Sequence, residues 1–233
     1  NVESAEIYQL VGHLPSKDYD TDQDEQILLV AHTAGPSIAQ GNGALGILAI
    51  IKYFSQMPQA DRHRTLTVYL DCRHYLPGLE SVFVDVSYFN RYPKAIEPIV
   101  AMLALEHLGE KEYREEGEKV IATGLAEQSY LWTRNNDLLI KEAISAVKNF
   151  GWSRVQVAVP ERPGVNSGTQ EYWWGVGTFA KRDKCGMFRC WDIPGYAMAG
   201  NLGYYWTSRS DIERWDQDLF HAQAATMTRL TGF

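Results

Sequence analysis

The chain has 233 residues, of which 45% are hydrophobic and 22% are charged, and its formal net charge is −7. This composition is typical of a globular protein and excludes intrinsic disorder, a collagen repeat and a coiled coil. No apolar run reaches the roughly 18 to 20 residues of a membrane-spanning helix, and no N-terminal stretch has the pattern of a signal peptide. The acidic balance argues against a nucleic-acid partner held by phosphate contacts. We therefore expect a soluble protein with neither a membrane nor a nucleic-acid partner.

The first predicted element is a buried strand at 27–31, a wholly apolar run between acidic residues and Gly35-Pro36. A helix is predicted over 43–54, because apolar residues recur there every three or four positions and Asn42 can serve as its N-cap. The same two patterns predict, in chain order, strands at 65–71 and 100–105, a helix at 138–150, a strand at 155–159 and a closing helix at 217–230.

Strands that alternate with helices indicate an α/β fold with a mostly parallel sheet covered on both faces. No Pro, Gly or Ser-rich linker divides the chain, so we expect one domain over residues 1–233. The stretch 164–203, rich in Gly and aromatic residues, is interpreted as loops over one edge of the sheet, and the charged segment 110–119 as an exposed turn. In such folds the ligand crevice lies beyond the carboxyl ends of the strands.

Polar residues follow three of the predicted strands at that edge. His32 follows the first strand, Arg73 and His74 follow the second, and Glu106 and His107 follow the third. A single strand-end His is more often a hydrogen-bonded structural residue than a functional one. Together, however, these side chains predict a site.

The segments that carry these residues form a series: His32-Thr33-Ala34 with 41–46 (GNGALG), Asp71-Cys72-Arg73-His74 with Gly78-Leu79-Glu80-Ser81, and Leu105-Glu106-His107-Leu108-Gly109. In order and spacing the series resembles the co-catalytic zinc aminopeptidase family, which includes leucyl aminopeptidases, glutaminyl cyclases and the transferrin receptor ectodomain. Ile193-Pro194-Gly195 and Tyr204-Tyr205-Trp206-Thr207 also look like elements of that family. The resemblance implies a zinc-exopeptidase-like three-layer αβα sandwich with a mixed sheet, and it favours a secretory or extracellular location.

The departures from the family pattern concern the metal ligands. His32 matches the family's first His ligand, but the Asp that orients that His falls on Ala34 and the bridging Asp falls on Asn42. A neutral amide cannot hold two dications together. We therefore expect no dinuclear zinc centre.

The remaining family positions are also altered. The consecutive Glu pair, a general base and then a metal ligand, falls on Arg73 and His74, while the later Asp falls on Glu106 and the last His on Trp206. The resemblance thus leaves His32, His74 and Glu106 as ligands for at most one divalent metal, most naturally zinc. The alternative is a metal-free site in which Glu106 transfers the proton, tuned by His74 and Arg73.

Further side chains are candidates for substrate contacts. Asn42 can act as a neutral donor, and the resemblance places Trp173, Tyr205 and Trp206 in segments that overhang the site, where they would wall an apolar pocket. Glu171 is a second carboxylate candidate. For the aromatic residues, the alternative is ordinary core and loop packing.

Two functions follow from this pattern. The first is a divergent enzyme that hydrolyses, eliminates or cyclises a small organic or peptide-like substrate. The second is a binding or assembly module that has lost peptidase activity, as the transferrin receptor has. By the resemblance we also expect the chain to pack against an N-terminal fragment or a subunit of the same precursor. Cys185 and Cys190 either form a disulfide or stay reduced.

Overall fold

A seven-stranded mixed sheet with strand order β1-β3-β2-β4-β9-β7-β8 forms the centre of the molecule in the computed structural model. The structure describes residues 6, 8–33, 35, 37–72, 88–133, 136–149, 154–159, 193–200 and 212–232. The strands of this sheet are, in chain order, β1 (Leu10–Leu14), β2 (Gln26–His32), β3 (Thr65–Asp71), β4 (Ile99–Glu106), β7 (Ser129–Thr133), β8 (Val155–Ala158) and β9 (Gly195–Gly200). Four of its pairings are parallel, whereas β1 pairs with β3 and β7 with β9 in antiparallel fashion.

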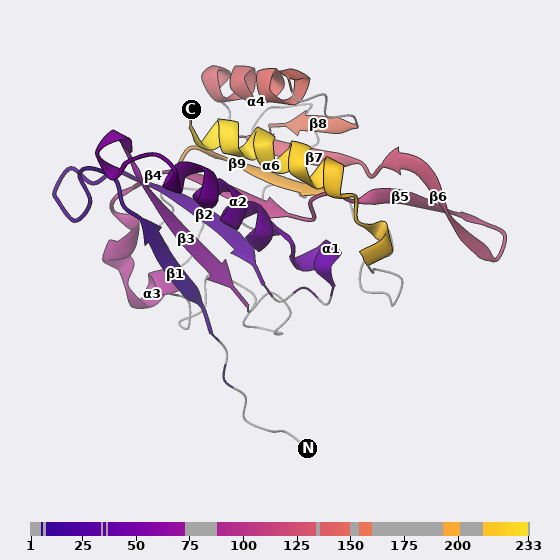
Figure 1. The fold of residues 1–233 in the computed structure, drawn as a ribbon, viewed down its shortest axis with the longest axis horizontal. Helices are drawn as coiled ribbons and strands as arrows, with labels where there is room; N and C mark the ends of the chain where they lie inside the picture. Colours follow the sequence, from indigo (N-terminus) through magenta and orange to yellow (C-terminus); the bar gives the residue numbers. More distant parts are fainter. Residues whose placement is uncertain are drawn as a thin grey trace.

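Helices cover both faces of this sheet (Figure 1). One face packs against α2 (Gly43–Ser55), α4 (Asp137–Asn149) and α6 (Gln217–Thr231), and the other against α3 (Tyr88–Arg91) and the 3-10 turn η2 (Pro93–Ile96). The remaining helical pieces are α1 (Ile38–Gly41), η1 (Gln59–Asp61) and η5 (Ile212–Arg214). The α/β fold with a mostly parallel mixed sheet is therefore confirmed.

The strands in the middle of the sheet are apolar on both faces. Every residue of β2 is buried, and along β4 alternate side chains enter two different clusters. Leu103 and Leu105 join the cluster beneath α2 and α6, while Met102 and Ala104 join the cluster beneath α3. Continuous apolar runs of this kind are what a strand covered on both faces requires.

The helix α2 begins in close contact with the end of β4. Its first residue, Gly43, has no Cβ, and a Cβ placed there would lie 1.8 Å from the carbonyl oxygen of Leu105. Only glycine allows the start of the helix to approach the strand so closely.

We expect Gly43→Ala to destabilise the fold by about 1 to 3 kcal/mol or more, because the added methyl group overlaps backbone rather than a movable side chain. Urea unfolding followed by circular dichroism measures this. The matched control is Gly12→Ala, where a Cβ would meet no atom of the described residues within 4 Å. Equal stability of the two variants would contradict the contact.

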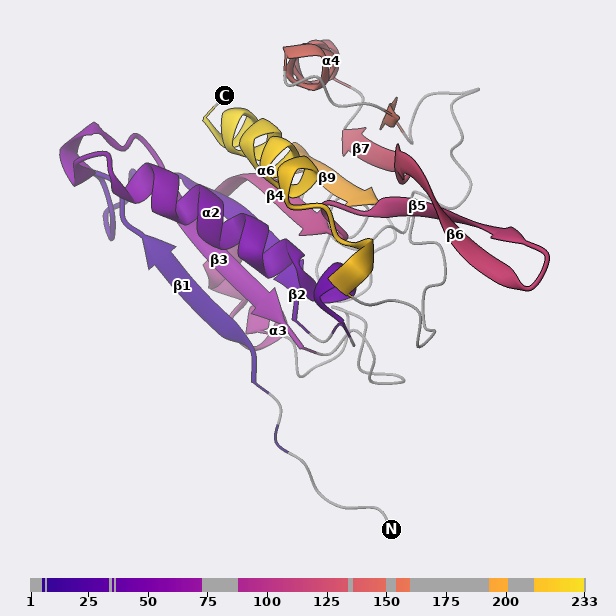
Figure 2. The same cartoon turned by 45° about the vertical axis from the view of Figure 1, so that its right-hand side comes forward.

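Two interpretations of the sequence are wrong. The segment 110–119 is not simply an exposed turn, because it contains β5 (Lys111–Glu116), which pairs with β6 (Lys119–Ala126) in a hairpin that projects from the body (Figure 2). Residues 195–200 do not belong to an edge loop, because β9 pairs with both β4 and β7 inside the sheet. Gly and Ala have low strand propensity, so its sequence GYAMAG gave no strand signal although every residue is buried.

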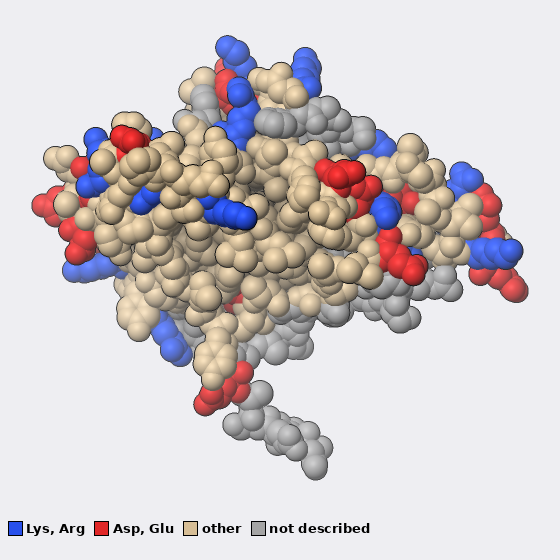
Figure 3. Space-filling view, viewed as in Figure 1, with Lys and Arg blue, Asp and Glu red and all other residues tan. Residues whose placement is uncertain are grey.

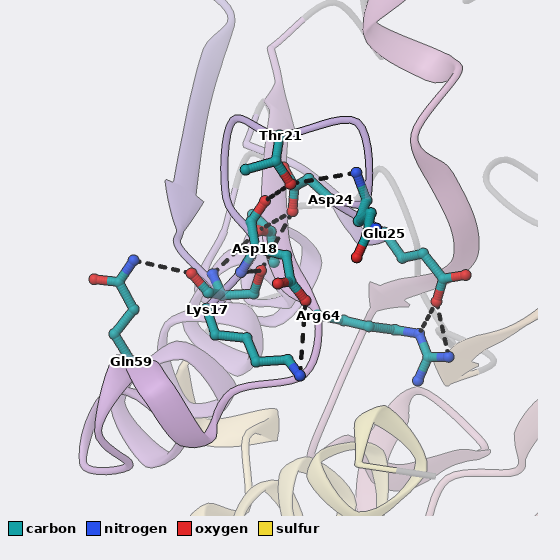
Figure 4. A network of polar contacts seen from close by, with 10 residues as sticks. Lys17, Asp18, Thr21, Asp24, Glu25, Gln59 and Arg64 are labelled. Carbon is teal, nitrogen blue, oxygen red and sulfur yellow. Dashed lines mark hydrogen bonds and ion pairs between the residues drawn. The ribbon is translucent and has the colours of Figure 1, made fainter.

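At the amino-terminal ends of β2 and β3, a polar network anchors the loop between β1 and β2 (Figure 4). The Asp24 carboxylate accepts hydrogen bonds from Thr65 Oγ1 at 2.6 Å and Gln26 Nε2 at 2.8 Å. Thr67 Oγ1 in turn donates to Gln26 Oε1 at 2.6 Å. The acidic residues that precede β2 therefore include a buried structural carboxylate.

The surface over α2 is poor in charge. In the view of Figure 3, charged side chains gather at the left and right ends and at the top of the molecule, and much of the middle is uncharged. Leu45, Leu48 and Tyr53 of α2 are exposed there. Among the described helices, none has the length and apolar content that crossing a membrane demands.

Candidate functional site

The carboxyl ends of the parallel strands bring His32 and Glu106 together. His32 is the last residue of β2 and Glu106 the last of β4, and these strands are neighbours in the sheet. The Nε2 atom of His32 lies 3.5 Å from Oε2 of Glu106. Both side chains are buried, with exposed fractions of 1% and 3%. By the alternation of side chains they leave the sheet on the face of Val30 and Ala104, away from α2.

His107 is the third member of this group. It follows β4 directly, and its φ of 52° places it in the left-handed region. Its Nε2 lies 3.9 Å from Oε2 of Glu106, and its ring meets that of His32 edge-on with centroids 6.0 Å apart. Sequence reasoning placed His107 at a strand end but not among the site residues. The structure brings one ligand atom from each of His32, Glu106 and His107 within 4.8 Å of one another.

The geometry and chemistry of this group fit a zinc ion. A tetrahedral zinc with nitrogen and oxygen ligands at about 2.0 to 2.1 Å separates neighbouring ligand atoms by about 3.3 Å. The separation of 3.5 Å between Nε2 of His32 and Oε2 of Glu106 is close to that value. Imidazole and carboxylate are both ordinary zinc ligands.

The environment of His107 also favours a ligand. Its Nδ1 lies 3.3 Å from the carbonyl oxygen of Gly200 at the end of β9. Because a carbonyl oxygen only accepts, this bond requires a proton on Nδ1, and in the neutral ring Nε2 then carries the lone pair. That lone pair is on the nitrogen nearer Glu106. Metal-binding histidines are commonly held in this way.

The predicted bridging position, Asn42, has both polar atoms of its side chain bonded to one residue. Its Nδ2 donates to the Leu108 carbonyl oxygen at 2.6 Å, and its Oδ1 accepts from the Leu108 backbone N–H at 2.8 Å. Asn42 is 1% exposed. Its predicted role in substrate binding stays a prediction, while the structure gives it a contact with the loop that carries His107.

A further buried carboxylate lies next to the site. Asp71, the last residue of β3, is in register with His32, is 2% exposed and accepts a hydrogen bond from the Tyr69 hydroxyl at 3.0 Å. The backbone N–H of Thr33 donates to the Asp71 carbonyl oxygen at 2.7 Å. These contacts join the ends of β2 and β3.

Glu110 follows the loop that carries His107 and lies near the end of β9. A Cβ placed on Gly200 would be 3.4 Å from Cγ of Glu110 and 3.6 Å from Cβ of His107. Burial raises the pKa of the Glu110 carboxyl to about 9, partly offset by the Arg214 guanidinium, while Glu127 raises it further. Glu110 is therefore a neutral acid at neutral pH.

Several predicted site residues lie outside the described part of the chain. They are Arg73, His74, Glu171, Trp173, Tyr205 and Trp206, together with Cys185 and Cys190. Their roles stay predictions.

Comparison with known proteins gives a match in structure and none in sequence. No protein-family model and no curated protein sequence matches the chain. Its structure is similar to a zinc aminopeptidase from Bacillus subtilis, with a TM-score of 0.60 and 12% identity over 96% of this chain and 49% of that one. It is also similar to the glutaminyl cyclase of Porphyromonas gingivalis, with a TM-score of 0.57 and 15% identity over 95% of this chain and 81% of that one.

A third similar structure is nicastrin, a component of gamma-secretase, with a TM-score of 0.58 and 11% identity over 96% of this chain and 43% of that one. The chain thus spans less than half the length of the aminopeptidase and of nicastrin. At these identities the likeness is one of fold. The chain has the zinc-exopeptidase-like α/β fold of the aminopeptidases that its sequence resembles.

Proposed function

We propose that this chain is a divergent enzyme on an aminopeptidase-like scaffold, which acts on a small organic or peptide-like substrate through one mononuclear site rather than a two-zinc centre. The observation that carries the proposal is the buried group of His32, Glu106 and His107 at the carboxyl edge of the sheet. Three ionisable side chains buried in contact cost free energy, which favours a chemical role over a packing role.

These three residues would hold a single zinc ion, with the predicted His74 as an additional candidate ligand. A bound zinc would supply Lewis acidity and lower the pKa of a water molecule. In the alternative, metal-free site, Glu106 would hold or receive the proton, since its Oε2 faces Nε2 of both His32 and His107. Hydrolysis, elimination and cyclisation all need such a proton transfer.

The first test is metal content. Protein purified without chelator is expected to carry close to one zinc ion per chain, and His32→Ala and His107→Ala are each expected to lower zinc affinity by more than about 100-fold, because each removes a direct ligand. Elemental analysis and zinc titration measure both.

The matched control is His13→Ala, because this histidine lies on β1 and contacts Thr67 rather than the site. Close to two zinc ions per chain would refute the mononuclear site, as would unchanged affinity in His107→Ala. Absence of zinc from folded protein, together with no turnover of small esters, amides and peptides, would favour the binding or assembly module instead.

A further inference from the structure

The start of α2 is tied to the loop after β4 by one side chain. Asn42 is the N-cap residue of α2, yet its side chain makes no hydrogen bond to its own helix. Its amide instead bonds to both the N–H and the C=O of Leu108, which lies 66 residues away in sequence. A side-chain amide has one donor end and one acceptor end, so it matches the two backbone groups of a single residue.

Leu108 is the residue directly after His107. The left-handed backbone of His107, at φ 52°, is unfavourable for a residue with a Cβ and persists only where neighbouring structure holds it. Four further bonds restrain the same loop. Gly109 N–H donates to Gln223 Oε1 at 2.6 Å, and the Gly109 carbonyl oxygen accepts from Asp216 N–H at 2.7 Å. Gly200 N–H donates to the His107 carbonyl oxygen at 3.1 Å, and Nδ1 of His107 lies 3.3 Å from the Gly200 carbonyl oxygen. The loop is thus held by α2, α6 and β9.

We infer that Asn42 is a positioning residue, which fixes the backbone of Leu108 and so turns the His107 imidazole toward Glu106 and His32. The inference rests on the proposed function, in which these three residues form the site. In this role Asn42 acts on the site through His107, because both polar atoms of its side chain bond to the backbone of Leu108.

This role requires an amide rather than a carboxylate. An ionised Asp has acceptors only, so Asn42→Asp would set a carboxylate oxygen against the Leu108 carbonyl oxygen, where Nδ2 now donates at 2.6 Å. Restoring the bridging Asp that the resemblance implies would therefore release the loop and lose His107 from the site. The site would not gain a second metal ion.

The test compares Asn42→Asp and Asn42→Ala with the control Gln26→Ala. Gln26 is also a buried amide with two side-chain partners, Asp24 and Thr67. It is the first residue of β2, however, and so lies at the other end of that strand from His32. Two quantities are measured in each protein: zinc affinity by titration against a competing chelator, and amide hydrogen exchange at Leu108 by NMR.

Both Asn42 variants are expected to exchange the Leu108 N–H at least about 10-fold faster and to bind zinc about 10- to 100-fold more weakly, as losses of supporting contacts around metal ligands do. Gln26→Ala is expected to lower thermal stability while leaving zinc affinity within about threefold. Unchanged zinc affinity in Asn42→Asp, or a second zinc ion bound by it, would overturn the inference.

Failure of the proposed function is distinguishable from failure of this inference. If the wild-type protein binds no zinc, the proposed metal site fails, and the positioning role is then decided by Leu108 exchange and by the imidazole ¹⁵N resonances of His107 in the Asn42 variants. Resonances and exchange rates equal to those of the wild type would overturn it. If neither variant folds, the wild type decides: rapid exchange of its Leu108 N–H would overturn the inference, because it would show that Asn42 does not hold this backbone.

Discussion

Glu106→Gln is expected to lower turnover by about 100- to 10,000-fold once a substrate is known, which is the usual cost of losing a positioned proton-transfer group. The substitution keeps the shape and burial of the side chain but removes its charge. In the wild type, Oε2 of Glu106 lies 3.5 Å from Nε2 of His32 and 3.9 Å from Nε2 of His107. Zinc affinity should fall as well, because an amide is a poorer ligand than a carboxylate. Steady-state kinetics on small esters, amides and peptides, with zinc titration in parallel, measure both effects.

The matched control for this substitution is Glu25→Gln. Glu25 is an exposed carboxylate beside Arg64. It directly precedes β2, at the other end of that strand from His32, so loss of its charge should leave turnover unchanged. Near-normal turnover in a folded Glu106→Gln protein would reject this site and direct attention to Glu171 and the aromatic segments around it. A binding module would instead keep its partner affinity through both substitutions.

The elements that sequence predicts well are those whose hydrophobic pattern matches their final burial. The range 65–71 equals β3, the predicted strand 27–31 is one residue shorter than β2 at each end, and the predicted helix 43–54 ends one residue before α2 does. These segments are apolar because the sheet is covered on both faces, so pattern and burial agree. By contrast β9 is built from small residues, and its strand state comes from pairing with β4 and β7.

The contact between His32 and Glu106 could be predicted from the sequence, because both residues end predicted strands and the carboxyl ends of neighbouring parallel strands lie together. The contribution of His107 does not follow from it. Strict alternation would send the side chain after Glu106 to the opposite face, and only the left-handed turn at φ 52° brings it back. Histidine adopts the left-handed region more often than most residues with a Cβ, but only a few per cent of residues other than glycine do so, and residue type alone therefore did not indicate that turn.

Asn42 shows the second limit of sequence reasoning. Its place before an apolar helix predicted an N-cap, and its backbone does occupy that position. Its side chain, however, bonds to Leu108 in a distant part of the sequence. Local capping rules consider only neighbours in sequence, so a tertiary contact that competes for the same amide lies beyond them.

The stability of the fold is expected to decrease as pH rises from about 5 to 9, with Glu110 as a main cause. Its pKa is raised by burial to about 9 from an ordinary value of 4.5. Between these two pH values the folded state keeps a proton that the unfolded state releases. Deprotonation therefore favours unfolding, and the stabilisation present below pH 4.5 is lost as pH rises through the window.

Glu110→Gln isolates this effect, because glutamine keeps the shape of the neutral acid and cannot ionise. Each pH unit inside the window should change the unfolding equilibrium constant of the wild type by up to about tenfold relative to the variant. Urea unfolding at a series of pH values in the presence of chelator measures the two curves. Glu115→Gln on the exposed part of β5 is the control and should run parallel to the wild type.

A Glu110→Gln protein that is less stable than the wild type at pH 8 would contradict this prediction. If the Glu110 carboxylate were ionised and held by the nearby Arg214, glutamine at this position would lower stability at pH 8 instead of raising it. The burial of Glu110, which is 3% exposed and whose Oε1 makes no hydrogen bond to the described residues, argues against that state. A less stable Glu110→Gln protein at pH 8 would therefore show that attraction to Arg214 exceeds the cost of burying the charge.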